Sequence, residues 1–100
     1  MPQHFLVVIE GPQPGEKVEL GRDPVVIGRR APSNWLLPSD PLLSRLHCRV
    51  ALVNDEVTVV DLNSTNGTYL NGGLVIGSTP WPPGTQIEVG AYILEHQVSP

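Results

Sequence analysis

Turn-forming residues divide this chain into many short segments. Eleven prolines and ten glycines are spread over 100 residues, and a proline lacks the backbone donor that helix interiors and central strands require. The runs between these turns are apolar or alternate between polar and apolar residues, as half-buried or buried strands do. Little in the sequence indicates a helix. The sequence therefore predicts an all-β domain, a sandwich or barrel, with about ten to eleven short strands.

The expected strands follow from the positions of the turns. Asn54-Asp55 and Asn71-Gly72 each separate two β-rich runs by two residues that tolerate positive φ, which predicts two tight hairpins. No repeat, low-complexity tract or linker is visible, which indicates one domain. The expected strands cover residues 4–10, 17–20, 25–27, 35–37, 48–53, 56–62, 68–70, 74–76, 86–89 and 91–98.

A second Asn-Gly pair, Asn66-Gly67, lies only five residues before the hairpin at Asn71-Gly72. It closes an unbroken run of short polar residues that begins at Asn63. Such residues form local hydrogen bonds and leave backbone N–H groups exposed, which suits the binding of an anion. A simple connecting turn is the alternative, and this stretch alone leaves both open.

Charge and cysteine content exclude several classes of protein. The net charge of −4 argues against a general nucleic-acid binder. No apolar run approaches the ~20 residues of a membrane span, and the N-terminal run is too short for a signal peptide. Cys48 is the only cysteine, so we expect no intrachain disulfide and no zinc site, but a small buried side chain. A reducing, cytoplasmic location is the natural expectation.

The basic residues are concentrated in one part of the sequence. Four of the six fall between residues 24 and 54, where Asp40 is the only acid. Such a cluster in an acidic protein suits a small, specific anion. Scattered arginines on a solvated surface are the alternative interpretation. The four residues are Arg29, Arg30, Arg45 and Arg49.

Three motifs on strand-ending loops together resemble the forkhead-associated (FHA) domain, a phosphothreonine-binding module. They are Gly28-Arg29, Ser44-Arg45-Leu46-His47 and Ser64-Thr65-Asn66-Gly67, in this order; Asn71-Gly72 and the Pro83-Gly84 ending also look like that family. The resemblance covers about residues 25–98. It implies a single FHA-type domain over residues 1–100, which we expect to be a piece of a longer protein. The implied fold is a β-sandwich of the FHA/SMAD type, with two mainly antiparallel sheets and binding loops at one end.

The resemblance also implies a role for individual residues. Arg29 and Ser44 would hold the phosphate, with Arg45 nearby as a third donor. Thr65 would bound the pocket where the family fits the threonine methyl group, and Asn66 would hydrogen-bond the main chain of the ligand. The residues implied to support this site are Gly28, His47, Gly67 and Asn71.

The function implied by the resemblance is phosphothreonine-dependent peptide or protein recognition in Ser/Thr-kinase signalling. The expected partners are a phosphothreonine-containing protein and an upstream Ser/Thr kinase, without nucleic acid, membrane, metal or cofactor. Ser44, His47 and Asp61 could be imagined as a catalytic triad. No nucleophile elbow surrounds the serine, and in the family this histidine is structural. We therefore expect no enzyme.

Several large side chains have alternative interpretations. Trp35, Leu42 and Leu46 lie on or near the loop that should flank the peptide. They could form an apolar rim that prefers a hydrophobic residue downstream of the phosphothreonine. Such a rim also suggests an alternative function, a scaffold or self-association domain that binds an unphosphorylated surface around Trp35. Burial of these side chains in the core is equally open.

Three further residues are expected to be structural only. Trp81 stands where the family usually has leucine, which predicts a core position. His4 and His96 have no ligand-like partner at a useful spacing and are expected to be ordinary surface or sheet residues.

Overall fold

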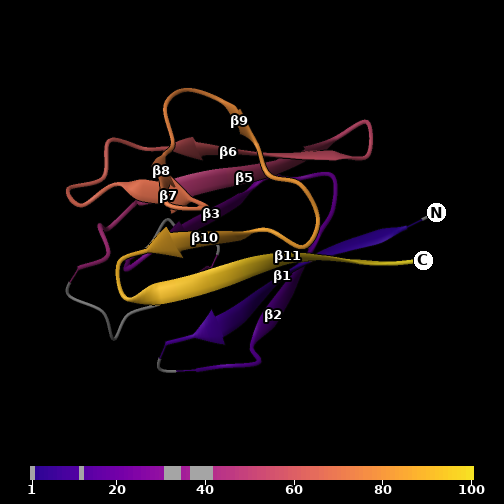
Figure 1. Ribbon diagram of the computed structural model, residues 1–100, viewed down its shortest axis with the longest axis horizontal. Helices are drawn as coiled ribbons and strands as arrows, with labels where there is room; N and C mark the ends of the chain where they lie inside the picture. Colours follow the sequence, from indigo (N-terminus) through magenta and orange to yellow (C-terminus); the bar gives the residue numbers. More distant parts are fainter. Residues whose placement is uncertain (1, 12, 31–34, 37–41) are drawn as a thin grey trace.

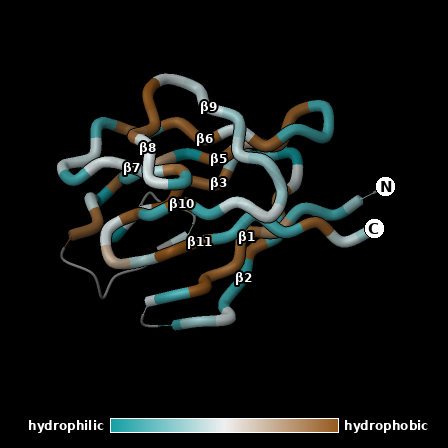
Figure 2. Tube along the Cα trace, in the orientation of Figure 1, coloured by the Kyte–Doolittle hydropathy of each residue, from teal (hydrophilic) through white to brown (hydrophobic). Residues whose placement is uncertain are grey.

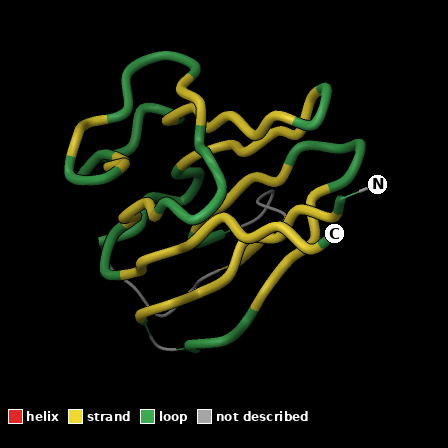
Figure 3. The backbone as a smooth tube through the Cα atoms, turned by 45° about the vertical axis from the view of Figure 1, so that its right-hand side comes forward, coloured by secondary structure: helices red, strands yellow, loops and turns green. Residues whose placement is uncertain are grey.

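The computed structural model describes residues 2–11, 13–30, 35–36 and 42–100. Over these residues the chain forms strands and loops and no helix (Figure 3). The all-β prediction is thus confirmed. The strands are β1 (Gln3–Glu10), β2 (Lys17–Leu20), β3 (Val25–Gly28), β4 (Trp35–Leu36), β5 (Cys48–Val53), β6 (Glu56–Asp61), β7 (Thr68–Leu70), β8 (Gly73–Leu74), β9 (Thr79–Pro80), β10 (Gln86–Val89) and β11 (Tyr92–Ser99).

The strands form two sheets packed face to face (Figure 1). One has six strands in the order β2-β1-β11-β10-β7-β8, and the other has five in the order β4-β3-β5-β6-β9. Among the described residues, all strand pairings are antiparallel except that of β3 with β4. Figure 1 shows both termini at the end of the sandwich that carries the β5–β6 hairpin, while the β6–β7 loop lies at the other end.

Four strands begin or end one residue away from their expected bounds, the strand expected over residues 74–76 is shifted, and one strand was not expected. Of the run 74–76, only Leu74 is in a strand, together with Gly73. Thr79 and Pro80 form β9, which pairs with β6 at the edge of the five-stranded sheet. Proline is tolerated at such an edge because no inner partner needs its missing N–H. Residue 37, expected at the end of the strand 35–37, lies outside the described residues.

Both predicted hairpins are confirmed. Asn54 and Asp55 have φ of 51° and 64°, and Asn71 and Gly72 have φ of 48° and 83°. Two consecutive positive φ values are the signature of the type I′ turn, whose twist matches that of the flanking strands. Figure 2 shows hydrophilic residues at the β5–β6 turn and hydrophobic residues concentrated along the strands.

The core lies between the sheets and includes the two side chains expected there. Trp81 is fully buried, and its ring nitrogen donates to the carbonyl of Thr85 at 2.9 Å. Cys48 is also fully buried. Burial, with the charge of Asp61 nearby, raises the pKa of its thiol to about 12. The thiol therefore stays protonated and behaves as a small hydrophobe.

Trp35 does not contribute to an exposed apolar rim, so this expectation is wrong. Only 6% of the residue is exposed, and its ring nitrogen donates to Glu16 at 2.9 Å. Glu16 directly precedes β2, whereas Trp35 begins β4 of the other sheet. The indole therefore closes the space between the two sheets instead of facing a partner.

His4 and His96 lie in sheet strands, as expected, but they are not surface residues. They are 4% and 1% exposed, and their rings are joined by a hydrogen bond of 2.9 Å between Nδ1 of His4 and Nε2 of His96. The other nitrogen of His4 lies 2.9 Å from Asp55, and His96 Nδ1 donates to the carbonyl of Trp81 at 2.7 Å. This chain of contacts connects β1, β11 and the β5–β6 turn.

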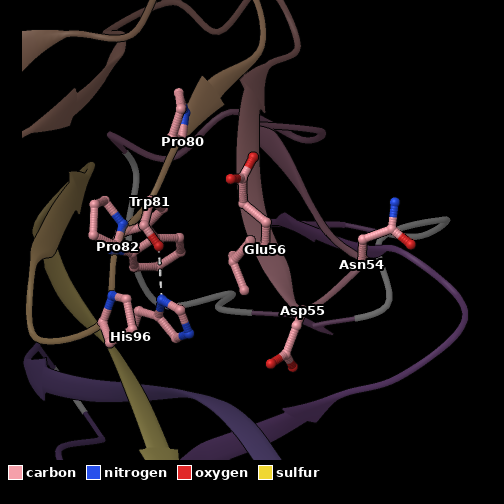
Figure 4. A pocket seen from close by; sticks show the side chains of 9 residues that line it. Asn54, Asp55, Glu56, Pro80, Trp81, Pro82 and His96 are labelled. Carbon is pink, nitrogen blue, oxygen red and sulfur yellow. Dashed lines mark hydrogen bonds between the residues drawn. The ribbon is translucent and has the colours of Figure 1, made fainter.

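A pocket of about 330 Å³ lies beside this histidine chain. Figure 4 shows Trp81 and His96 on one side of it and Asp55 and Glu56 on the other. Among the described residues, no group of three or more His, Cys, Asp or Glu side chains is placed to hold a metal ion. The described residues also include no helix long and apolar enough to cross a membrane.

Candidate functional site

The loop that follows residue 41 is attached directly to the end of β3. The backbone N–H of Arg29 donates to the carbonyls of Ser44 and Arg45, both at 3.1 Å. Its side-chain Nε donates to the carbonyl of Leu43 at 2.9 Å. Leu43 is almost fully buried and anchors this loop in the core. The guanidinium plane of Arg29 is therefore fixed at the rim of the sheet, close to Ser44.

A second loop, between β6 and β7, is bonded to the first. The backbone N–H of Thr65 donates to the Ser44 hydroxyl at 2.9 Å, and the Asn66 amide donates to the carbonyl of Leu42 at 2.8 Å. Because the Ser44 oxygen accepts this bond, its own proton remains available to an acceptor. Thr65 and Asn66 are both exposed. The structure thus brings together Arg29, Ser44, Thr65 and Asn66 from three segments.

His47 lies beneath both loops and forms a hydrogen bond to each of them. It is fully buried, and its Nδ1 accepts from the backbone N–H of Ser44 at 3.1 Å. Its Nε2 therefore carries the proton and donates to the carbonyl of Gly67 at 2.8 Å. The His47 backbone donates to Ile27 on β3 and accepts from Leu62 after β6. One imidazole thus sets the spacing between the two loops.

The imagined catalytic triad is not formed. Ser44 meets His47 through its backbone N–H, and its hydroxyl faces the Thr65 backbone instead. Asp61 bonds to Ser64 and Thr68. Among the described residues, the His47 ring thus bonds to the Ser44 backbone and the Gly67 carbonyl, and not to the Ser44 hydroxyl or to Asp61.

Asp61 organises the β6–β7 loop, a role that the sequence interpretation missed. Its carboxylate accepts from the backbone and hydroxyl of Ser64 and from the hydroxyl of Thr68 at 2.7 Å. The Ser64 hydroxyl in turn accepts from the Gly67 N–H at 2.9 Å. Partial burial acts to raise the pKa of Asp61, but the bonds from Ser64 and Thr68 outweigh it and lower the pKa. An Asp three residues before a Ser is a local capping pattern that the sequence displays.

Replacing Asp61 with alanine is expected to lower the free energy of unfolding by about 1–3 kcal/mol, because three donors lose their acceptor. Since folding lowers the pKa of Asp61, its contribution is present above the unfolded pKa near 3.8 and is lost as pH falls through the folded pKa. Urea unfolding between pH 2.5 and 6 measures both effects. Glu56→Ala, an exposed carboxylate on the same strand, is the matched control. An equal loss in both variants would contradict the role given to Asp61.

The predicted supporting glycines and Asn71 lie where backbone geometry matters. Gly28 is buried at the end of β3. Gly67 has φ of 86°, and a Cβ there would lie 3.0 Å from the Leu74 side chain and 3.2 Å from the Tyr69 ring. Asn71 forms the β7–β8 turn and donates its backbone N–H to Gln86 at 3.2 Å. A side chain at position 67 would therefore disturb the loop both through the positive φ and through its contacts with Leu74 and Tyr69.

The remaining predicted residues lie on the rim of the site. Arg45 is exposed, and its carbonyl also accepts from the backbone N–H of Arg30 at 3.3 Å. Leu42 and Leu46 are 51% and 38% exposed. An apolar rim formed by Leu42 and Leu46, without Trp35, therefore stays a prediction.

Comparison with known proteins gives consistent matches. The family model "FHA domain" matches residues 25–90. The FHA domain-containing protein FhaB of Mycobacterium tuberculosis is 38% identical over 91 residues, which are 91% of this chain and 58% of FhaB. The glycogen accumulation regulator GarA of the same species is 35% identical over 96 residues, 96% of this chain and 58% of GarA. The chain thus spans a little over half the length of these relatives.

A solved structure supports the same assignment. It comes from a structural and functional analysis of phosphothreonine-dependent FHA domain interactions and superposes with a TM-score of 0.86. Sequence identity is 28%, and the match covers 98% of each chain.

Proposed function

Because the chain belongs to the FHA domain family, whose members are recognition modules and not enzymes, we propose that it binds phosphothreonine-containing peptides or proteins. The observation that carries this proposal is the fixed pair of Arg29 and Ser44, joined by hydrogen bonds to the loop at Thr65 and Asn66. A phosphate ester carries roughly −1.5 to −2 charges and three strong acceptor oxygens. Arginine, hydroxyl and backbone donors are the groups that such an anion requires.

Each residue has a distinct part in this proposal. The guanidinium of Arg29 and the hydroxyl of Ser44 donate to phosphate oxygens, and the exposed Arg45 adds positive charge. Thr65 bounds the space for the threonine methyl group. The Asn66 amide uses one N–H on Leu42, so its second N–H and its oxygen remain to bind the ligand main chain.

The proposal extends to the biological setting of the chain. Residues 1–100 form a single recognition domain of a longer protein in the cytoplasm, and a Ser/Thr kinase generates its ligand. The alternative, a scaffold that binds an unphosphorylated surface around Trp35, loses its support because Trp35 is buried.

Isothermal titration calorimetry with a phosphothreonine peptide library, its phosphoserine version and its unphosphorylated version tests the proposal. Two to four charge-assisted bonds, less the cost of ordering a peptide, suggest a Kd on the order of micromolar. Arg29→Ala is expected to weaken binding by about 30- to 100-fold, or roughly 2–3 kcal/mol. Arg29→Lys keeps the charge but lacks the planar guanidinium, so its affinity should lie between those of wild type and Arg29→Ala.

Phosphothreonine-dependent binding that Arg29→Ala removes would support the proposed function. Binding that is equal for phosphorylated and unphosphorylated peptides, and that survives Arg29→Ala, would contradict it.

A further inference from the structure

Two side chains of the β7–β8 hairpin pack against the candidate binding loop. Tyr69 and Leu74 are cross-strand partners. A Cβ added to Gly67 would meet Leu74 Cδ1 at 3.0 Å, Tyr69 Cε2 at 3.2 Å and the Tyr69 hydroxyl at 3.3 Å. Both side chains therefore lie over the Cα of Gly67, one residue after Asn66. We call this pair the Tyr69–Leu74 shelf.

The shelf is apolar and largely open to solvent. Tyr69 is 38% exposed and Leu74 is 54% exposed, whereas the preceding Thr68 is fully buried. This alternation shows that Tyr69 lies on the outer side of its sheet. A tyrosine next to a leucine offers apolar contact area with one polar end, the composition found at recognition surfaces.

The shelf has a fixed position relative to the candidate phosphate-binding groups. The carbonyl of Gly67 accepts from His47, and its N–H donates to Ser64. His47 also accepts from the backbone of Ser44. The shelf, Asn66 and Ser44 are thus connected through one rigid frame, and a ligand would not have to order this surface on binding.

We propose that the Tyr69–Leu74 shelf binds an apolar side chain flanking the phosphothreonine and sets the sequence preference of the domain. This inference rests on the proposed function. Because the shelf lies next to Gly67, it is the apolar surface beside a peptide whose main chain is held at Asn66. Two side chains suit one residue of a peptide, whereas a stable contact with a second copy of the chain needs about 800 Å² per partner.

A substitution scan of one phosphothreonine peptide tests the inference. The peptide has alanine at all other positions, and each position from −4 to +4 is changed in turn to leucine or serine. At one flanking position we expect the peptide with leucine to bind about five- to tenfold more tightly than the peptide with serine. This is the effect of burying part of a leucine side chain. Leu74→Ser and Tyr69→Ser should each reduce this ratio to below about twofold.

Three comparisons make this result specific. Both variants should lose more affinity for the leucine phosphopeptide than for the all-alanine phosphopeptide, because only the leucine side chain reaches the shelf. Tyr69→Phe should retain the preference for leucine. Val53→Ser replaces another exposed apolar residue (61% exposed) at the opposite end of the sandwich and should leave the leucine preference unchanged.

Several outcomes would overturn the inference. Tight phosphopeptide binding with no leucine preference at any position would overturn this inference and leave the proposed function intact. A leucine preference that survives both serine variants would do the same. A dimer in sedimentation that Leu74→Ser dissociates would assign the shelf to a second copy and would overturn it too. Failure of wild type to bind any phosphopeptide would overturn the proposed function first, and this inference with it.

Discussion

His47→Ala is expected to lower the free energy of unfolding by about 2–4 kcal/mol and to remove most of the affinity for phosphopeptides. The imidazole is fully buried and bonds to the Ser44 N–H and the Gly67 carbonyl. Alanine leaves both buried backbone groups without partners and adds a cavity, and each of these effects costs about 1–3 kcal/mol. The two loops would also lose their common support, so Ser44 and Asn66 would no longer be held at a fixed separation.

Urea unfolding monitored by tryptophan fluorescence, together with phosphopeptide titration, measures the two effects of His47→Ala. The matched control is Cys48→Ala, which shortens the adjacent side chain, also fully buried. It should lower stability by about 1 kcal/mol and leave the affinity intact. If His47→Ala bound phosphopeptides as well as Cys48→Ala does, the role of His47 in spacing the loops would be wrong.

His96 is expected to make the domain less stable as the pH falls below about 6.5. Burial lowers the pKa of His96, and the nearby His4 lowers it further, against an opposing effect of the bond to the Trp81 carbonyl. In the unfolded chain a histidine takes up a proton near pH 6.5, whereas the folded His96 does not until a lower pH. The unfolded state therefore binds more protons, and the free energy of unfolding falls by up to about 1.4 kcal/mol per pH unit.

The titratable groups around His96 come from three elements. His4 lies on β1, Asp55 lies in the β5–β6 turn 2.9 Å from His4, and Glu56 lines the same pocket. His96→Gln keeps a donor and an acceptor but cannot titrate, so it should flatten the stability curve between pH 5 and 6.5. His96→Ala should in addition lower stability at pH 7 by about 2–4 kcal/mol. A slope below pH 6.5 that is unchanged in His96→Gln would contradict this assignment.

The parts of the fold that were predictable from sequence depend on neighbours along the chain. Asn54-Asp55 and Asn71-Gly72 adopt positive φ because of their own side-chain chemistry, so a two-residue pattern was sufficient. The short strands could be read from the alternation between turns. The burial of Trp35 could not be predicted in this way, because its indole bonds to Glu16, a residue distant in sequence that directly precedes β2 of the other sheet. The bounds of β8 and the presence of β9 could not be predicted either, because pairing at a sheet edge depends on the partner strand.

The candidate site was predictable in its components but not in its geometry. The order of Gly-Arg, Ser-Arg-x-His and Ser-Thr-Asn-Gly motifs indicated the family. How Arg29 is oriented depends on the carbonyl of Leu43, fourteen residues away. The His4–His96 hydrogen bond joins residues 92 positions apart, and no local sequence pattern predicts such a contact. Asp61 is different, because its bonds to Ser64 and Thr68 are local enough to have been recognised.

The pairing of the first and last strands has a mechanical consequence. β1 and β11 run antiparallel, with Gln3 opposite Ser99, and both chain ends leave the sandwich beside each other (Figure 1). A tension between segments attached at the two ends would act along the hydrogen bonds of this ladder, which are perpendicular to the strands, and would break them one after another from Gln3 inward. The domain should therefore unzip at low force, beginning at the end farthest from the loops around Arg29 and Asn66.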